Sequence, residues 1–228
     1  MNNLLNRVAR KIKFLLLETR VRNFRQLKKI KPFDRIDDAT LAANKIVLQP
    51  YFDEYVREVS VADMAASLEL ATFIYTACQA NRYSKLLDTG SGLSSFVFRL
   101  YARGQPGVTV WSVDDDAAWL EKTRTFLTKH GLSVENVVEL NDFLALKERD
   151  FDCILHDLNF VDVRIKYVDR ILDLARPGGF VVFDDVHKPD YRLEVLSLLK
   201  HRRASVFSVK PVTQDGFGRF SLAALKHT

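Results

Sequence analysis

The strongest constraint on the fold is an alternation that begins at Lys85. From that residue on, short apolar runs alternate with amphipathic segments long enough to form helices. This alternation is typical of βα units, which build a parallel sheet with helices on both faces. The expected strands are Lys85–Asp88, Val108–Val113, Val137–Leu140, Phe151–Asp157 and Gly179–Asp184. The expected helices are Ser94–Ala102, Ala117–His130, Val163–Ala175 and Asp190–Lys200.

The alternation stops close to the C-terminus. Ser205–Val209 and Arg219–Leu225 are both strand-like, and segment 210–218 between them leaves no room for a helix. Strands joined without a crossover helix pair in antiparallel fashion. We therefore expect an α/β fold with a doubly wound, mostly parallel seven-stranded sheet that ends in an antiparallel hairpin.

Residues 1–83 precede this pattern and read as a helical extension of the α/β domain at 84–228. Apolar residues at three- and four-residue steps predict a basic amphipathic helix at residues 3–29 and a second helix around 38–57. A third helix is expected within Val61–Ala80, with Ser60 as its N-cap.

Positive charge is concentrated at the start of the extension. Residues 1–31 hold ten Lys and Arg side chains against one acid, so their net charge is +9. The net charge of the whole chain is +5, so the remaining residues carry −4. Three interpretations stay open: packing on the body or on a second copy in a homodimer, docking on an anionic membrane surface, and contact with nucleic acid. Packing is favoured because the segment is too apolar for a purely electrostatic arm.

The remaining bulk features are those of an ordinary cytoplasmic protein. No apolar run approaches the roughly 20 residues of a membrane-spanning helix, and the N-terminus lacks the pattern of a secretory signal. Cys78 and Cys153 lack the spacing of zinc ligands or of a small disulfide framework. We expect a cytoplasmic location, and peripheral membrane contact through the basic helix stays open as an alternative.

Two loops of the predicted sheet carry the features of a nucleotide site. Asp88-Thr-Gly90-Ser-Gly92 follows the first strand, where glycine lets a backbone approach a ligand closely. Asp114 and Asp115 follow the second strand, where a carboxylate can accept hydrogen bonds from both hydroxyls of a ribose. A strand-to-helix turn and a helix N-cap are the alternatives. A nicotinamide site is disfavoured because Ser95 stands where its fingerprint has a third glycine.

The motifs resemble those of Rossmann-like S-adenosylmethionine-dependent methyltransferases over residues 84–225. Leu86–Ser95 resembles the first motif of that family, Val113–Leu120 the second, Phe151–Asp157 the fourth, and Arg176–Asp184 the segment of strand five. The resemblance implies S-adenosylmethionine as cofactor, with Gly90, Gly92 and the small Ser94 near its methionine portion. It also implies Asp114, with Asp115 beside it, at the ribose, Asp142 at the adenine, and Asp88 orienting the loop and the ligand ammonium.

The reacting centre is expected at the carboxyl ends of strands four and five. Asp157, Asp184 and Asp185 could converge there on a hard divalent cation such as Mg²⁺. This layout is similar to that of catechol-type O-methyltransferases, although no lysine base follows Asp157 closely. Asp157 and His187 are the candidate catalytic residues, with His187 as the base. Acids at these positions could instead contact cofactor or substrate, or cap a helix.

Three classes of function follow from these observations. The first is an enzyme that methylates a small-molecule acceptor, at oxygen. The second is a nucleic-acid methyltransferase that binds through the basic helix, but the strand-four motif His156-Asp-Leu-Asn159 differs from the type that stacks a flipped base. The third is a non-catalytic protein that binds an adenosyl ligand. Aminopropyl transfer on the same fold is a distant fourth.

Overall fold

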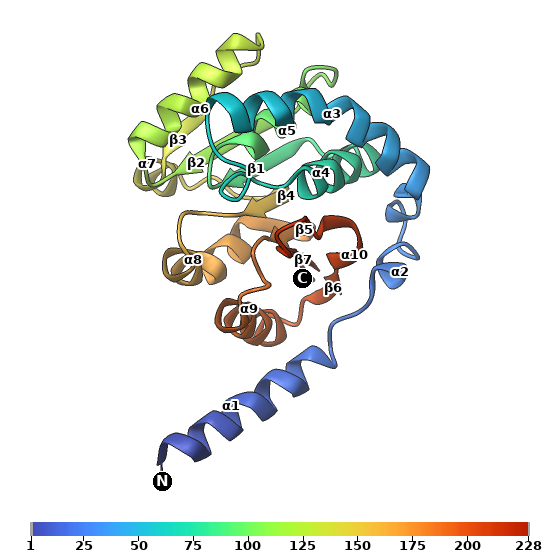
Figure 1. Cartoon of the computed structure of the whole chain (residues 1–228), viewed down its shortest axis with the longest axis vertical. Helices are drawn as coiled ribbons and strands as arrows, with labels where there is room; N and C mark the ends of the chain where they lie inside the picture. Colours follow the sequence, from blue (N-terminus) through green and yellow to red (C-terminus); the bar gives the residue numbers. More distant parts are fainter. Residues whose placement is uncertain (1, 228) are drawn as a thin grey trace.

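The computed structural model describes residues 2–227, with side chains from residue 6 onward. Its centre is a seven-stranded sheet in the order β3-β2-β1-β4-β5-β7-β6 (Figure 1). The strands are β1 (Lys85–Thr89), β2 (Thr109–Asp114), β3 (Val137–Glu139), β4 (Phe151–His156), β5 (Ala175–Phe183), β6 (Ser205–Ser208) and β7 (Leu222–Leu225). The pairs among β1 to β5 are parallel, and β7 runs antiparallel to both of its neighbours. The predicted sheet and its closing hairpin are confirmed.

Helices cover both faces of the sheet. These are α4 (Leu68–Asn81), α5 (Leu93–Ala102) and α6 (Ala117–Lys129) on one face, and α7 (Leu140–Ala145), α8 (Val161–Leu174) and α9 (Pro189–His201) on the other. Side chains alternate along each strand, so that Leu86 packs into the first layer and Leu87 into the second. Both layers are filled by large apolar side chains, as a sheet that is buried on both faces requires.

The strand order reverses beside β1, which pairs with β2 on one side and β4 on the other. In open α/β sheets, ligands bind at such a switch point, outside the carboxyl ends of the strands. Thr89 pairs with His156, and His156 pairs with Phe183, so β1, β4 and β5 end in one row. The loops after these three strands therefore begin side by side.

The N-terminal extension packs on this body. It contains α1 (Asn2–Glu18), α2 (Phe24–Leu27), the short 3₁₀ helix η1 (Phe33–Arg35) and α3 (Asp38–Glu58). Phe33 packs against Phe180 of β5 with ring centroids 4.9 Å apart. The predicted boundary near residue 83 stays a prediction, since the extension and the α/β body share one hydrophobic core.

The single helix predicted at residues 3–29 is wrong, because the chain leaves the helix after Glu18. Backbone hydrogen bonds join Arg22 to β6: its N–H donates to Val206 O at 2.9 Å, and its carbonyl accepts from the Ser208 N–H at 2.8 Å. Asn23 then begins α2 through a capping box with Gln26. The extended residue covers the edge of β6, which an uninterrupted helix could not do.

Two further boundaries differ from the prediction. The third helix begins at Leu68, where the Ser67 hydroxyl accepts a hydrogen bond from the Leu70 N–H, and Ser60 caps nothing. Segment 59–66 is therefore a loop. The connection between β6 and β7 holds one helical turn, α10 (Lys210–Thr213), where no helix was expected.

Within residues 2–227, no helix is both long and apolar enough to cross a membrane.

Candidate functional site

A cleft of about 370 Å³ lies at the carboxyl ends of β1, β2, β4 and β5. Its floor is the glycine loop 90–94 together with the strand ends. Tyr55 of α3 and loop residues 63–66 line it from the extension, and Arg219 lines it from the segment that precedes β7. The cleft therefore lies at the topological switch point, and both the extension and the C-terminal region contribute to its wall.

The two glycines predicted for this loop are required by close contacts within the protein. Gly90 has φ +102°, and a Cβ there would lie 2.3 Å from the Asp157 carbonyl oxygen. Gly92 has φ +153°, and its Cβ would lie 2.7 Å from the Tyr55 hydroxyl. A side chain at either position is strained as well as obstructed. The glycines let the loop pack against β4 and α3, and both line the cleft.

Asp88 lies beneath the loop, fully buried at the end of β1. Its Oδ2 accepts hydrogen bonds from the hydroxyls of Ser94 at 3.0 Å and Ser95 at 2.6 Å, whereas its buried Oδ1 has no partner. Burial raises the pKa of Asp88 to about 7, despite the two serine hydroxyls. Asp88 is not among the residues that line the cleft, so its contact with the ligand ammonium stays a prediction.

Asp114 lines the cleft at the end of β2. Its Oδ2 accepts from the Ser91 N–H at 2.7 Å and its Oδ1 from the Asp116 N–H at 3.2 Å. Burial raises the pKa of Asp114 to about 6. The N-cap of α6 is Asp116, whose Oδ1 accepts from two helix N–H groups, so the capping alternative does not apply to Asp114. Each carboxylate oxygen keeps capacity for a further hydrogen bond, as ribose hydroxyls require.

Asp115 and Asp142 have other surroundings. Asp115 is exposed, and both of its carboxylate oxygens accept from the Asn159 side-chain amide at 2.9 Å. Asp142 is exposed in the first turn of α7 and is not among the residues that line the cleft. Their cofactor contacts stay predictions.

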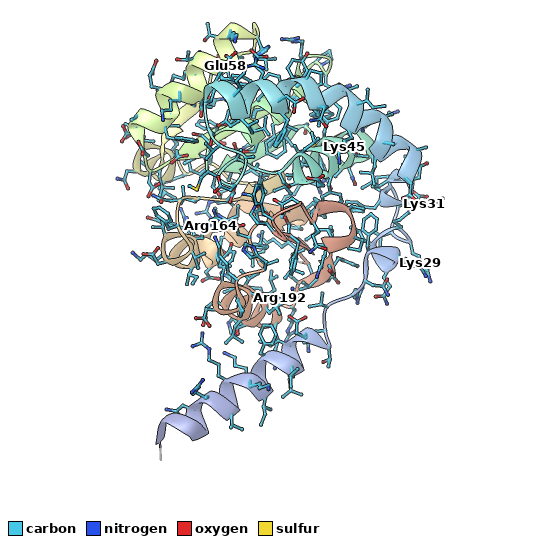
Figure 2. The ribbon with its side chains drawn as sticks, in the orientation of Figure 1. Lys29, Lys31, Lys45, Glu58, Arg164 and Arg192 are labelled. Carbon is cyan, nitrogen blue, oxygen red and sulfur yellow. The ribbon has the colours of Figure 1, made fainter. Side chains whose placement is uncertain are left out.

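The three predicted metal ligands lie at the other end of the cleft, around a buried arginine. Arg164 of α8 lies with Nη2 at 2.6 Å from Asp157 Oδ1 and Nη1 at 3.2 Å from Asp185 Oδ2 (labelled in Figure 2). Asp184 Oδ1 instead accepts from the Ser221 hydroxyl at 2.6 Å. Among the residues that the structure describes, no three His, Cys, Asp or Glu side chains are arranged to hold a metal ion. The carboxylates do not fit the divalent-cation site, because a protein cation already lies between two of them.

The carboxylates at this end of the cleft differ in how readily they ionise. Burial raises the pKa of Asp157 well above its ordinary value, although Arg164 acts in the opposite direction. Burial also acts to raise the pKa of Asp185, but the hydrogen bond from Lys188 and the charge of Arg164 outweigh it, so that the pKa is lowered. Asp185 is therefore the carboxylate of this group that stays ionised most readily.

His187 lines the cleft beside Asp185, with Nδ1 3.5 Å from Asp185 Oδ1. Its side chain is about one-third exposed, whereas His156 is fully buried. The His156 ring contacts the Thr89 hydroxyl at 2.8 Å and the Arg164 carbonyl at 3.0 Å, and burial lowers its pKa to about 4. His156 is thus a neutral structural residue, and His187 is the imidazole that a ligand in the cleft can reach.

Sequence reasoning missed two residues of this site, Arg164 and Arg219. Arg164 lies in the predicted helix Val163–Ala175, and the only signal was its place seven residues after Asp157. Tyr55 lies in segment 51–64, which the sequence suggests as a lid over the first motif, although its contact with Gly92 is not visible in the sequence. Arg219 donates to the carbonyls of Ala62 and Asp63 and fixes the loop before α4, a contact between residues more than 150 positions apart.

The buried carboxylate of Asp88 predicts that the stability of the folded protein depends on pH. Between the ordinary carboxyl pKa and about 7, the folded protein holds a proton on Asp88 that the unfolded chain releases, so rising pH destabilises the fold. Asp88→Asn removes this charge and keeps an acceptor for the serines. We expect its Tm to exceed that of the wild type by a few degrees at pH 8 and to match it at pH 4. Asp142→Asn, at an exposed position, is the control. If Asp88→Asn raised the Tm by the same amount at both pH values, the raised pKa of Asp88 would be contradicted.

No family model and no curated protein matches this chain. Solved structures do match, at low identity. The O-methyltransferase TomG of Streptomyces achromogenes, in complex with S-adenosylmethionine, has a TM-score of 0.58 at 19% identity over 89% of this chain and 95% of its own. A putative O-methyltransferase of Klebsiella pneumoniae has a TM-score of 0.60 at 18% identity over 82% and 97%. An O-methyltransferase of Bacillus cereus, in complex with S-adenosylhomocysteine, has a TM-score of 0.52 at 18% identity over 89% and 96%. The chain therefore has the fold of class I S-adenosylmethionine-dependent methyltransferases.

Proposed function

We propose that this protein transfers a methyl group from S-adenosylmethionine to an oxygen of a small-molecule acceptor. The observation that carries the proposal is the cleft itself. One end has the glycine loop and Asp114, and the other end has Asp185 and His187, so one cavity joins a nucleoside site to an acid–base pair. The O-methyltransferases among the matching structures support the choice of reaction.

The first end of the cleft suits the nucleoside and amino-acid parts of the cofactor. Asp114 would accept hydrogen bonds from the ribose hydroxyls, and Asp88 would position the glycine loop through Ser94 and Ser95. Trp119 is fixed by a hydrogen bond from its Nε1 to the Ser91 carbonyl at 2.5 Å, which places the indole at the wall beside Asp114. The bound cofactor supplies a methyl group on a sulfonium, which an acceptor oxygen attacks in line.

The second end supplies the base. An acceptor hydroxyl must lose its proton as it attacks, and a positioned imidazole can take that proton. The carboxylate of Asp185 lies beside Nδ1 of His187, so Nε2 is the atom that takes the proton and Asp185 stabilises the imidazolium. Lys188 and Arg164 keep Asp185 ionised for this role. Asp157, with its raised pKa, is a partner for an acceptor hydroxyl.

The proposed reaction does not require a divalent cation. Arg164 is buried and contacts two of the three carboxylates that a Mg²⁺ site would use. The Ser221 hydroxyl donates to Asp184 Oδ1, and Lys188 shares Asp185 Oδ2 with Arg164. A fixed guanidinium supplies positive charge at the place where a metal ion would neutralise these acids.

The cleft favours a small acceptor over nucleic acid. Six carboxylates line it, from Asp63, Asp114, Asp116, Asp157, Asp184 and Asp185, and they would repel a phosphate backbone. The excess of basic residues lies in the first 31 positions, and residues 32–228 together carry a net charge of −4. We therefore assign the cleft to a neutral or cationic hydroxylated molecule.

Transfer of labelled methyl groups tests this function. Purified protein is incubated with methyl-labelled S-adenosylmethionine and a panel of catechols, phenols and aliphatic alcohols, with EDTA or with MgCl₂. We expect at least one hydroxylated acceptor to be labelled, at rates that agree within twofold in EDTA and MgCl₂. Binding of the cofactor without transfer to any acceptor would favour a binding protein, and activity lost in EDTA and restored by Mg²⁺ would contradict the role given to Arg164.

Substitution of the base separates catalysis from binding. His187→Gln should lower kcat about 100- to 10,000-fold, the usual contribution of general-base catalysis, and leave the Kd for S-adenosylhomocysteine within twofold. His201→Gln, at the exposed end of α9, is the matched control and should behave as the wild type. An unchanged kcat in His187→Gln would remove His187 from the mechanism.

A further inference from the structure

We propose that α1 docks this protein on an anionic lipid membrane surface. The proposal concerns a face of the molecule that takes no part in the cleft, and it holds whether or not the protein transfers methyl groups. Figure 1 shows α1 leaving the body beside α9, with the N-terminus directed away from the sheet. The helix packs on the body along one face only.

The packed face of α1 is fixed to α9 by apolar and ionic contacts. Leu17 is buried in the second core layer, and Phe14 packs against that layer. The Glu18 carboxylate receives two hydrogen bonds from Arg192 of α9, the one from Nη2 at 2.6 Å (Arg192 is labelled in Figure 2). Arg10 pairs with Asp190 at 2.7 Å. These contacts set which side of the helix is turned outward.

The outward side is apolar. Val8, Ile12, Leu15 and Leu16 have exposed fractions of 49%, 52%, 56% and 62%. At 3.6 residues per turn they fall within a stripe about 80–120° wide, on the side of the helix opposite Leu17. Four large aliphatic side chains exposed in a row along one helix need a covering partner. Nothing in the described part of the chain covers them.

Basic side chains border this stripe and identify its partner. Arg7, Lys11 and Lys13 are exposed on α1, and Arg20 follows its end. Lys200 of α9 extends the basic border, because it lines a groove with Ile12 and Leu16. An apolar stripe within a basic border is the pattern of a helix that lies in the interface of an anionic bilayer. Each Lys or Arg held near such a surface strengthens binding about fivefold.

The other partners fit less well. A second copy of α1 packed along the stripe would bring the same basic borders together and would be repelled. Nucleic acid would meet the basic residues but would leave the four aliphatic side chains in water. A lipid surface satisfies both features at once, because acyl chains take up the aliphatic side chains while anionic headgroups face the lysines and arginines.

Vesicle flotation of the full-length protein tests the proposal. The vesicles are phosphatidylcholine alone or phosphatidylcholine mixed with phosphatidylglycerol. The stripe variant is Ile12→Glu with Leu16→Glu, and the charge variant is Lys11→Glu with Lys13→Glu. Ile46→Glu with Val47→Glu is the matched control, because it places two acids at exposed apolar positions of α3. All three substituted pairs are exposed, and equal Tm values will show that the fold is kept.

We expect wild type and control to float with the phosphatidylglycerol vesicles and to stay unbound with phosphatidylcholine alone. Both α1 variants should bind at least tenfold more weakly, and high salt should weaken the wild type. No flotation of the wild type, or equal flotation of the stripe variant, would overturn the proposal. So would a dimer in sedimentation that the stripe variant dissociates, since the stripe would then be an interface between two copies.

Discussion

The site depends on one close backbone contact, the approach of the loop after β1 to the end of β4. Gly90 lies against the Asp157 carbonyl, and the Asp157 N–H donates to Thr89 O at 2.7 Å. The Gly90 N–H donates to Val113 O at 2.8 Å, which ties the same loop to β2. The ends of three strands are thereby held together, and the acids that follow them, Asp114 and Asp157, face one cleft. A side chain at position 90 would force these loops apart.

A second consequence of this geometry is a concentration of buried acids. Asp88, Asp114, Asp157 and Asp184 all have raised pKa values, because burial disfavours their charged forms. Carboxylates held in this way destabilise the folded protein above neutral pH, which is typical of a functional site. Arg164 limits the effect at one end, where it is the buried cation between two acids. At the other end, Oδ1 of Asp88 has no hydrogen-bond partner among the described residues.

The sheet and the first end of the cleft could be predicted from the sequence, because the features that define them are local. A strand, a glycine loop, a helix and an acid after the next strand are each visible within 30 residues, and the order of βα units fixes where they meet.

Arg164 was missed because a helix pattern does not show which polar residue turns inward. The break after Glu18 was missed because its cause is the edge of β6, almost 190 positions away. The loop before α4 was likewise missed because Arg219, more than 150 positions away, donates to the carbonyls of Ala62 and Asp63. The first end of the site was thus accessible from sequence, and the charge arrangement at the second was not.

Calorimetry with S-adenosylhomocysteine can test whether Asp114 and the glycine loop form an adenosyl site. The wild type should bind with a micromolar Kd, and Asp114→Asn should weaken binding about 10- to 100-fold, since it removes charge-assisted hydrogen bonds to the ribose. Glu121→Gln, an equivalent change on exposed α6, should bind as the wild type does. A wild type that binds neither S-adenosylhomocysteine nor S-adenosylmethionine, or an Asp114→Asn variant that binds with unchanged affinity, would contradict the account.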